Sequence, residues 1–286
     1  MELFRALGAL VEGADAPAVA AALGMNQPLD PAEQTNLFTF RLYPYASVYL
    51  GPEGMLGGEA RDRIAGFWRA IGRTPPDEPD HLCVLLALYA ELSEAAERQT
   101  NPPRKVMIDH ARRALFWEHL ASWLPIYLAQ VHRIGTPAYR QWGTLLEAAL
   151  LCEAKTLGPP EQLSLHLRAA PSLPDPRQVG GESFLAALLA PVRSGFIIMR
   201  DDLAEAGEAL GIGLRHGERR FVLKAMFAQE RRELLRWLGA LARRNAAAHA
   251  NLAAPWSDVT AFWSGRALAS AQLFETLAEH ADPVAS

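Results

Sequence analysis

The segment 75–92 constrains the fold of this chain most, because a proline-stiffened entry leads directly into an amphipathic helix. Prolines at three of its first five positions fix φ and disfavour helix in the residues that precede them. Asp77 is predicted to cap the helix, with Asp80 placed where a carboxylate meets free N–H groups. Apolar side chains then recur at helical spacing on one face: Leu82, Leu85, Leu86, Tyr89 and Leu92. The segment is therefore expected to form a capped helix with an acidic entrance.

Helical periodicity runs through the rest of the chain, and alternating strand patterns are almost absent. Only 194–199 (SGFIIM) reads as a short strand. A long helical pattern covers about 104–131 and is interrupted at Pro125. The predicted fold class is therefore all-α, with about ten to twelve helices.

The predicted domain organisation has three parts. Residues 1–168 form a helical bundle domain, and residues 182–286 form an additional C-terminal helical region. Between them, 169–181 contains three prolines and a glycine pair and is expected to be a linker.

Composition excludes several classes of protein. A formal charge of −4 provides no global field that would recruit nucleic acid or anionic lipid. No apolar run approaches the roughly 20 residues that span a bilayer, and the N-terminus lacks the features of a secretory signal. We therefore expect a cytoplasmic protein without a membrane span. Cys83 and Cys152 lie in apolar helical patterns and are expected to be reduced core residues.

No catalytic or metal-binding signature is present in the sequence. It contains no GxSxG elbow, no HExxH, no Walker loop and no Cys/His set with ligand spacing. The glycines of 211–217 (GIGLRHG) depart from GxGxxG and follow a predicted helix instead of a strand. We expect a protein that is not an enzyme and that holds no metal and no cofactor.

One alternative function is a DNA-binding regulator. Residues 201–226 imitate a helix-turn-helix whose second helix carries Arg219, Arg220 and Lys224. That helix is also rich in apolar residues, so a solvated charged face on a packing helix is the favoured interpretation. The lone histidines are interpreted as solvated in the same way: His110, His166 and His249.

Two histidines differ from the others. His81 follows Asp80 at a helix start, and His119 shares an apolar face with Phe116 and Trp123. Each imidazole could satisfy a loop or helix end in the core. Alternatively, the acidic residues 77–80 and the apolar faces line a groove for a peptide with a basic end and an apolar body. The sequence leaves both interpretations open.

These same residues carry a family resemblance. Residues 78–82 (EPDHL) precede an apolar helix, and about 35 residues later comes 116–125 (FWEHLASWLP). This pair of motifs resembles the TorD/DmsD/NarJ family of redox-enzyme maturation chaperones, over about residues 33–167. The resemblance implies a TorD-like helical bundle. The candidate peptide-binding residues are Asp77, Glu78, Asp80, His81, Phe116, His119, Trp123 and Pro125.

The resemblance also implies a function. Such a chaperone binds the twin-arginine leader and the apo form of a molybdopterin oxidoreductase catalytic subunit. It assists folding and cofactor insertion and thereby proofreads export or assembly. Weak guanine nucleotide binding is a further alternative that the family suggests. Residues 182–286 depart from the compact members, and this region could stabilise the bundle, contact the client or mediate a homodimer.

Overall fold

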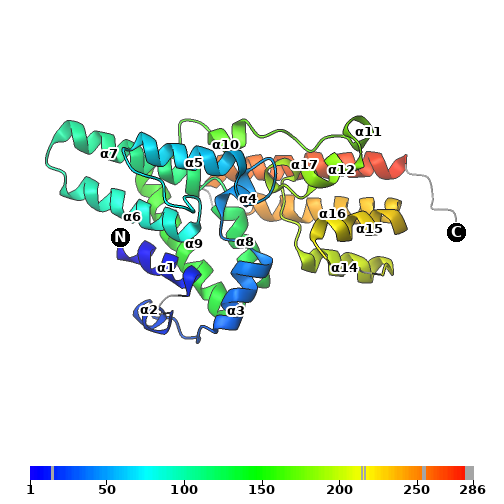
Figure 1. Cartoon of the computed structure of the whole chain (residues 1–286), viewed down its shortest axis with the longest axis horizontal. Helices are drawn as coiled ribbons and strands as arrows, with labels where there is room; N and C mark the ends of the chain where they lie inside the picture. Colours follow the sequence, from blue (N-terminus) through cyan, green and yellow to red (C-terminus); the bar gives the residue numbers. More distant parts are fainter. Residues whose placement is uncertain (14–15, 214, 216, 253–255, 281–286) are drawn as a thin grey trace. The chain divides into compact units, whose positions relative to one another are not determined.

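The computed structural model describes residues 1–13, 16–213, 215, 217–252 and 256–280. Within this described part, the chain forms seventeen α-helices (α1–α17) and two short π-helical segments, η1 and η2 (Figure 1). No strand is present there, and the sole β-type pairing is an isolated antiparallel bridge between Tyr45 and His81. The predicted all-α fold class is confirmed. No described helix is long and apolar enough to cross a membrane.

The chain divides into two compact units that do not follow a single cut in the sequence. Unit 1 comprises Met1–Ser47, Leu56–Arg168 and Ala254–Trp256. Unit 2 comprises Val48–Met55, Ala169–Ala253 and Ser257–Ser286. Each unit has its own buried core, and the two are described separately below.

The elements of unit 1 follow one another along the N-terminal part of the chain. They are α1 (Glu2–Glu12), α2 (Ala16–Ala22), α3 (Pro31–Thr35), η1 (Asn36–Arg41), α5 (Gly58–Ala70), α6 (Leu82–Arg98), α7 (Pro102–Ala114), η2 (Leu115–Leu120), α8 (Leu124–Ile134), α9 (Pro137–Leu157) and α10 (Leu165–Arg168). Helix α6 packs against both α1 and α7, and α8 packs against α9. The short helix α4 (Ala46–Leu50) lies where the chain passes from unit 1 to unit 2.

Aromatic side chains join the helices of unit 1 around α6. Tyr89 contacts Phe4 of α1 edge to face, with ring centroids 5.2 Å apart, and lies 5.6 Å from Phe116 of η2. Trp256, which belongs to unit 1, stacks on Phe116 at 6.2 Å. Trp142 of α9 donates its indole N–H to the carbonyl of Leu7, which satisfies the polar end of a buried ring. The motif helices therefore lie at the centre of the unit.

Two details of the predicted motif helices are wrong. Helix α6 begins at Leu82, and His81 occupies the N-cap position without a side-chain cap bond, so Asp77 is not the cap. The interruption expected at Pro125 lies earlier, at 121–123, because Pro125 occupies the first turn of α8, where its missing N–H costs nothing.

Unit 2 is built around the antiparallel pair α16 (Arg231–Ala250) and α17 (Ser257–Glu279), which lie side by side (Figure 1). Its other helices are α11 (Pro176–Val179), α12 (Gly181–Leu188), α13 (Pro191–Ser194), α14 (Arg200–Leu210) and α15 (Arg219–Gln229). The core is aliphatic and aromatic and includes Phe184, Leu235, Phe274 and Leu173. Leu173 and α11 both come from 169–181, the segment expected to be a linker.

The strand expected at 194–199 is absent. Instead, α13 ends at Ser194, and Gly195 adopts φ of 89°, a left-handed conformation that stops the helix. Residues 196–199 are buried but irregular, and the N–H of Met199 donates to the carboxylate of Asp202 in α14. The apolar run therefore reflects burial and not strand pairing.

Candidate functional site

The first motif is held by a connector, which we define as residues 42–46. The N–H of Ala46 donates to the carbonyl of Asp80 at 3.0 Å, and the N–H of Leu82 donates to the carbonyl of Pro44 at 2.8 Å. These two bonds form the bridge between Tyr45 and His81. A turn whose prolines prevent helix formation is thus fixed by long-range backbone pairing instead of by local caps.

Asp80 is a structural group in this arrangement. Its side chain is 2% exposed, and its carboxylate accepts a hydrogen bond from the N–H of Ser47 at 3.1 Å. Ser47 lies in the first turn of α4, so Asp80 acts as an N-cap that comes from a distant part of the chain. The hydroxyl of Ser47 in turn accepts a bond from the N–H of Gly57. The predicted contact residue Asp80 therefore lies beneath the surface.

His81 lies among aromatic and acidic neighbours. Its ring packs edge to face on Tyr45, with centroids 4.8 Å apart, and its Nδ1 lies 4.0 Å from Oε1 of Glu12 in α1. Burial lowers the pKa of His81, although the nearby carboxylates of Glu12, Glu78 and Asp80 oppose this shift. The imidazole is therefore neutral at pH 7 and adds no positive charge to its surroundings.

Three exposed carboxylates surround this turn, and we call Glu12, Asp77 and Glu78 the acidic rim. Glu78 accepts a hydrogen bond from the hydroxyl of Tyr45 at 2.9 Å, and the pKa of Tyr45 is raised to about 12 by burial and by that bond. The carbonyl of Asp77 accepts a bond from Arg61 of α5 at 2.8 Å. The rim is thus held from α1, α5 and the connector, and it presents negative charge to solvent.

The second motif is buried. Phe116 and Trp123 are fully buried, and Pro125 is also buried. The indole N–H of Trp123 donates to the carbonyl of His119 at 2.9 Å, which bridges the break between η2 and α8. Tyr127 of α8 donates its hydroxyl to the carbonyl of Leu42 at 3.3 Å. Because Leu42 begins the connector, both motifs are attached to the same five residues.

His119 hydrogen-bonds to a second histidine. Its Nδ1 lies 3.1 Å from Nε2 of His166 in α10, and its ring also contacts Phe67 of α5 at 5.2 Å. Burial lowers the pKa of His119 to about 3 and that of His166 to about 4. Both rings are neutral at pH 7, so one donates and the other accepts.

The structure places the eight predicted residues in two groups. Asp77 and Glu78 are exposed. The other six are buried: Asp80, His81, Phe116, His119, Trp123 and Pro125. Sequence reasoning did not select Glu12 and interpreted His166 as solvated. His166 is in fact 3% exposed, and His249 is 1% exposed, so for both of these histidines the solvated interpretation is wrong.

The expectation for the cysteines is also partly wrong. Cys152 is exposed, while Cys83 is partly buried. Burial and the neighbouring Glu12 raise the pKa of Cys83 to about 12, so this thiol stays protonated at neutral pH. In the described part of the chain, no cluster of three or more His, Cys, Asp or Glu residues is arranged to hold a metal ion.

The helix-turn-helix alternative receives no support from unit 2. Arg220 and Lys224 of α15 both form ion pairs with Glu182 of α12, and Arg219 donates to the carbonyl of Ile198. These cations are therefore engaged within the unit instead of presented to a phosphate backbone. Two residues of the intervening turn, 214 and 216, lie outside the described residues.

The comparison with known families bears directly on the two motifs. Residues 34–129 match the family described as nitrate reductase delta subunit, and this range contains the connector, the turn, α6, η2 and the first half of α8 as far as Ala129. No curated protein matches the chain. The resemblance predicted from the motifs is thus confirmed: over residues 34–129 the chain is similar to the nitrate reductase delta subunit family, a family of molybdoenzyme maturation chaperones.

Proposed function

We propose that this protein is a cytoplasmic chaperone that binds the twin-arginine leader of a molybdopterin oxidoreductase and holds its apo catalytic subunit until the cofactor is inserted. The observation that carries the proposal is the family match over 34–129, which includes all eight candidate residues. The family match supports the role of a maturation chaperone. Binding of the leader and control of the time of export are what we add to it.

The acidic rim supports recognition of an arginine pair. Guanidinium groups form charge-assisted hydrogen bonds with carboxylates, and a rim of three carboxylates can meet two of them. Asp77 and Glu78 are exposed, so they are reachable by a ligand, and His81 between the rim residues is neutral at pH 7. No positive charge from the imidazole therefore opposes a cationic peptide.

The buried motif residues have a positioning role in this proposal. The carboxylate of Asp80 holds the end of the connector through the N–H of Ser47. The first residue of the connector, Leu42, accepts a hydrogen bond from the hydroxyl of Tyr127, and its last residues pair with the backbone of the turn. We infer that these contacts hold the rim in a single geometry, because preorganised groups lose less entropy when a peptide binds. Direct contact with the leader is then assigned to the rim and not to Phe116 or Trp123.

The test is calorimetric titration of the full chain with a leader peptide. The peptide comes from a molybdopterin oxidoreductase encoded beside this protein, and a second peptide has Lys in place of both Arg residues. The double variant Asp77→Asn/Glu78→Gln is expected to bind the Arg peptide about twofold to thirtyfold more weakly, since two exposed ion pairs contribute about 0.2–1 kcal/mol each.

Glu97→Gln provides the matched control, because Glu97 is exposed at the far end of α6. Its affinity for the leader should equal that of the wild type. The wild type should also prefer the Arg peptide over the Lys peptide, because a carboxylate engages guanidinium in a bidentate geometry. Equal affinity of the rim double variant and the wild type would exclude the rim as the leader site.

A further inference from the structure

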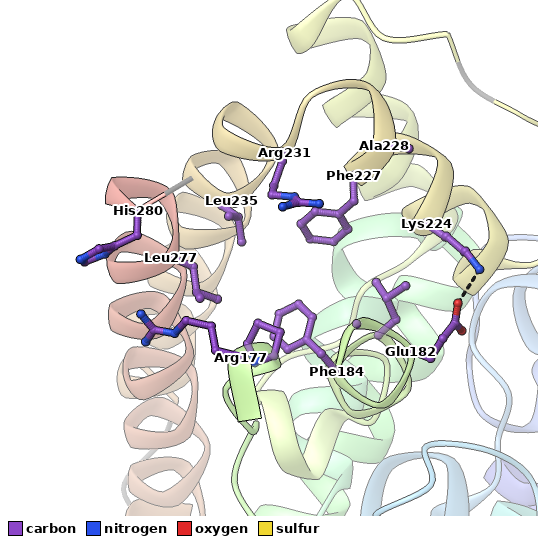
Figure 2. A pocket seen from close by; sticks show the side chains of 13 residues that line it. Arg177, Glu182, Phe184, Lys224, Phe227, Ala228, Arg231, Leu235, Leu277 and His280 are labelled. Carbon is purple, nitrogen blue, oxygen red and sulfur yellow. Dashed lines mark hydrogen bonds and ion pairs between the residues drawn. The ribbon is translucent and has the colours of Figure 1, made fainter. Parts of the chain in front are cut away.

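Unit 2 contains a pocket of about 590 Å³ between α12, α15, α16 and α17 (Figure 2). Its apolar lining includes Phe184, Phe227, Leu235 and Leu277, which come from these four helices. The volume lies within the range of about 300–1,000 Å³ that is typical of ligand pockets. The pocket belongs to 169–286, outside the segment that matches the family.

Basic side chains surround this apolar lining. Arg177, Lys224 and Arg231 line the pocket together with His280, whereas among the described lining residues the one carboxylate is Glu182. In Figure 2, Arg231 lies beside Phe227, and Arg177 lies across the pocket from it.

In the part of the chain that the structure describes, some of these basic side chains form ion pairs with carboxylates, and Arg231 does not. Asp175 pairs with Arg177, and Glu182 is shared by Lys224 and Arg220. Within the described residues, no carboxylate forms an ion pair with Arg231. The pocket therefore combines an apolar interior with excess positive charge at its margin, which complements an apolar ligand that carries an anionic group.

Two exposed apolar side chains lie on helices that line the pocket. Phe221 is 48% exposed and lies three and seven residues before the lining residues Lys224 and Ala228, so all three share a face of α15. Val179 is 42% exposed and ends α11, close in sequence to the lining residue Gly181. An occupant that covers these side chains is longer than a single small molecule, so the surface favours a polypeptide segment.

We propose that this pocket binds an apolar segment of a partner polypeptide. The segment also carries acidic side chains, and Arg231 is the main residue that contacts them. The apolar side chains of the segment enter between Phe184 and Leu277, and an acidic side chain meets the guanidinium of Arg231. The site lies in unit 2 and uses none of the rim residues. The proposal can therefore be tested separately from leader binding, and the failure of one does not refute the other.

Fluorescence polarisation of the full chain with two labelled eight-residue peptides tests this proposal. The first peptide contains Leu, Phe and Glu, and its counterpart has Lys at each Glu position. Ala228→Trp fills the pocket from an exposed position on α15, and Ala240→Trp is its matched control because Ala240 is exposed on α16 outside the lining. Arg231→Glu reverses the charge of the side chain that is proposed to contact the acidic group. Arg236→Glu makes the same change of charge at an exposed position of α16 outside the lining and is the matched control.

The Glu peptide should bind at least about tenfold more tightly than the Lys peptide. Ala228→Trp and Arg231→Glu should each weaken the Glu peptide by about tenfold, while both controls leave it unchanged. Circular dichroism establishes that each variant is folded, and Arg231→Glu decides the outcome if Ala228→Trp is not. Equal binding of the two peptides would overturn the proposal, as would unchanged binding in Arg231→Glu. Saturable binding of dodecanoate without binding of either peptide would assign the pocket to a free amphiphile and would also overturn it.

Discussion

Acidification is expected to destabilise unit 1 through the His119–His166 pair. In the folded chain, burial lowers the pKa of the two rings to about 3 and about 4, whereas an ordinary histidine has a pKa of about 6.5. Below pH 6.5 the unfolded chain therefore takes up protons that the folded chain does not. The stabilising contribution of the neutral pair is fully present above pH 6.5 and is lost as the pH falls toward 4.

The size of the effect follows from the number of protons. When both rings are protonated only in the unfolded state, the free energy of unfolding falls by about 2.7 kcal/mol per pH unit. Between pH 6.5 and pH 5, this amounts to at most about 4 kcal/mol. Since the whole stability of a domain is about 5–15 kcal/mol, the loss should be large enough to measure directly.

Two measurements check this reasoning. NMR titration of the histidine ring protons reports the pKa of His119 and of His166, and urea denaturation at pH 7 and pH 5 reports stability. The double variant His119→Gln/His166→Gln should be less stable than the wild type at pH 7, yet should lose about 3 kcal/mol less on acidification. His110→Gln, on an exposed position of α7, should behave as the wild type. Titration of either buried ring near pH 6.5, or equal losses in the wild type and the double variant, would refute the assignment.

Three further predictions concern single residues. Asp80→Ala should lower the free energy of unfolding by about 1–2 kcal/mol in urea denaturation, because the variant removes the cap of α4. Gly195→Ala should cost more than about 3 kcal/mol, since φ is 89° and an added Cβ would meet the backbone of α17, whereas Gly265→Ala, with open space around it, should cost nothing. Cys83, with its pKa raised to about 12, should react with iodoacetamide at pH 8 far more slowly than the exposed Cys152. Comparable rates of reaction of Cys83 and Cys152 would show that the thiol of Cys83 is not buried as described.

The helical fold was predictable because its signals are local. Apolar side chains at helical spacing identify α6 and η2, whereas Pro125, expected to interrupt a long helix, lies in the first turn of α8. The start of α6 was misplaced because the turn before it is held by Pro44 and Ala46, through backbone bonds that no local pattern encodes. Local chemistry therefore predicts the existence of an element better than its boundary.

The partners of the two motif histidines could not be predicted for the same physical reason. Glu12 lies in α1 and meets His81 only because α1 packs on α6. His166 lies 47 residues after His119, in a helix of four residues that carries little periodic signal. A buried imidazole requires a partner, so the sequence indicates that a partner exists without identifying it.

Most residues of the two motifs are buried, so a ligand cannot reach them in the folded chain. The six buried candidate residues include the two most distinctive side chains of the second motif, Phe116 and Trp123, each with no exposed surface. A leader peptide could touch these rings only if unit 1 opened, and opening would expose the aromatic contacts that join α1, α6 and η2. The exposed carboxylates of Glu12, Asp77 and Glu78 can meet a peptide without any such cost. If the rim double variant loses leader binding while its stability is unchanged, and Asp80→Ala loses both, the motif acts by positioning the rim and not by contact.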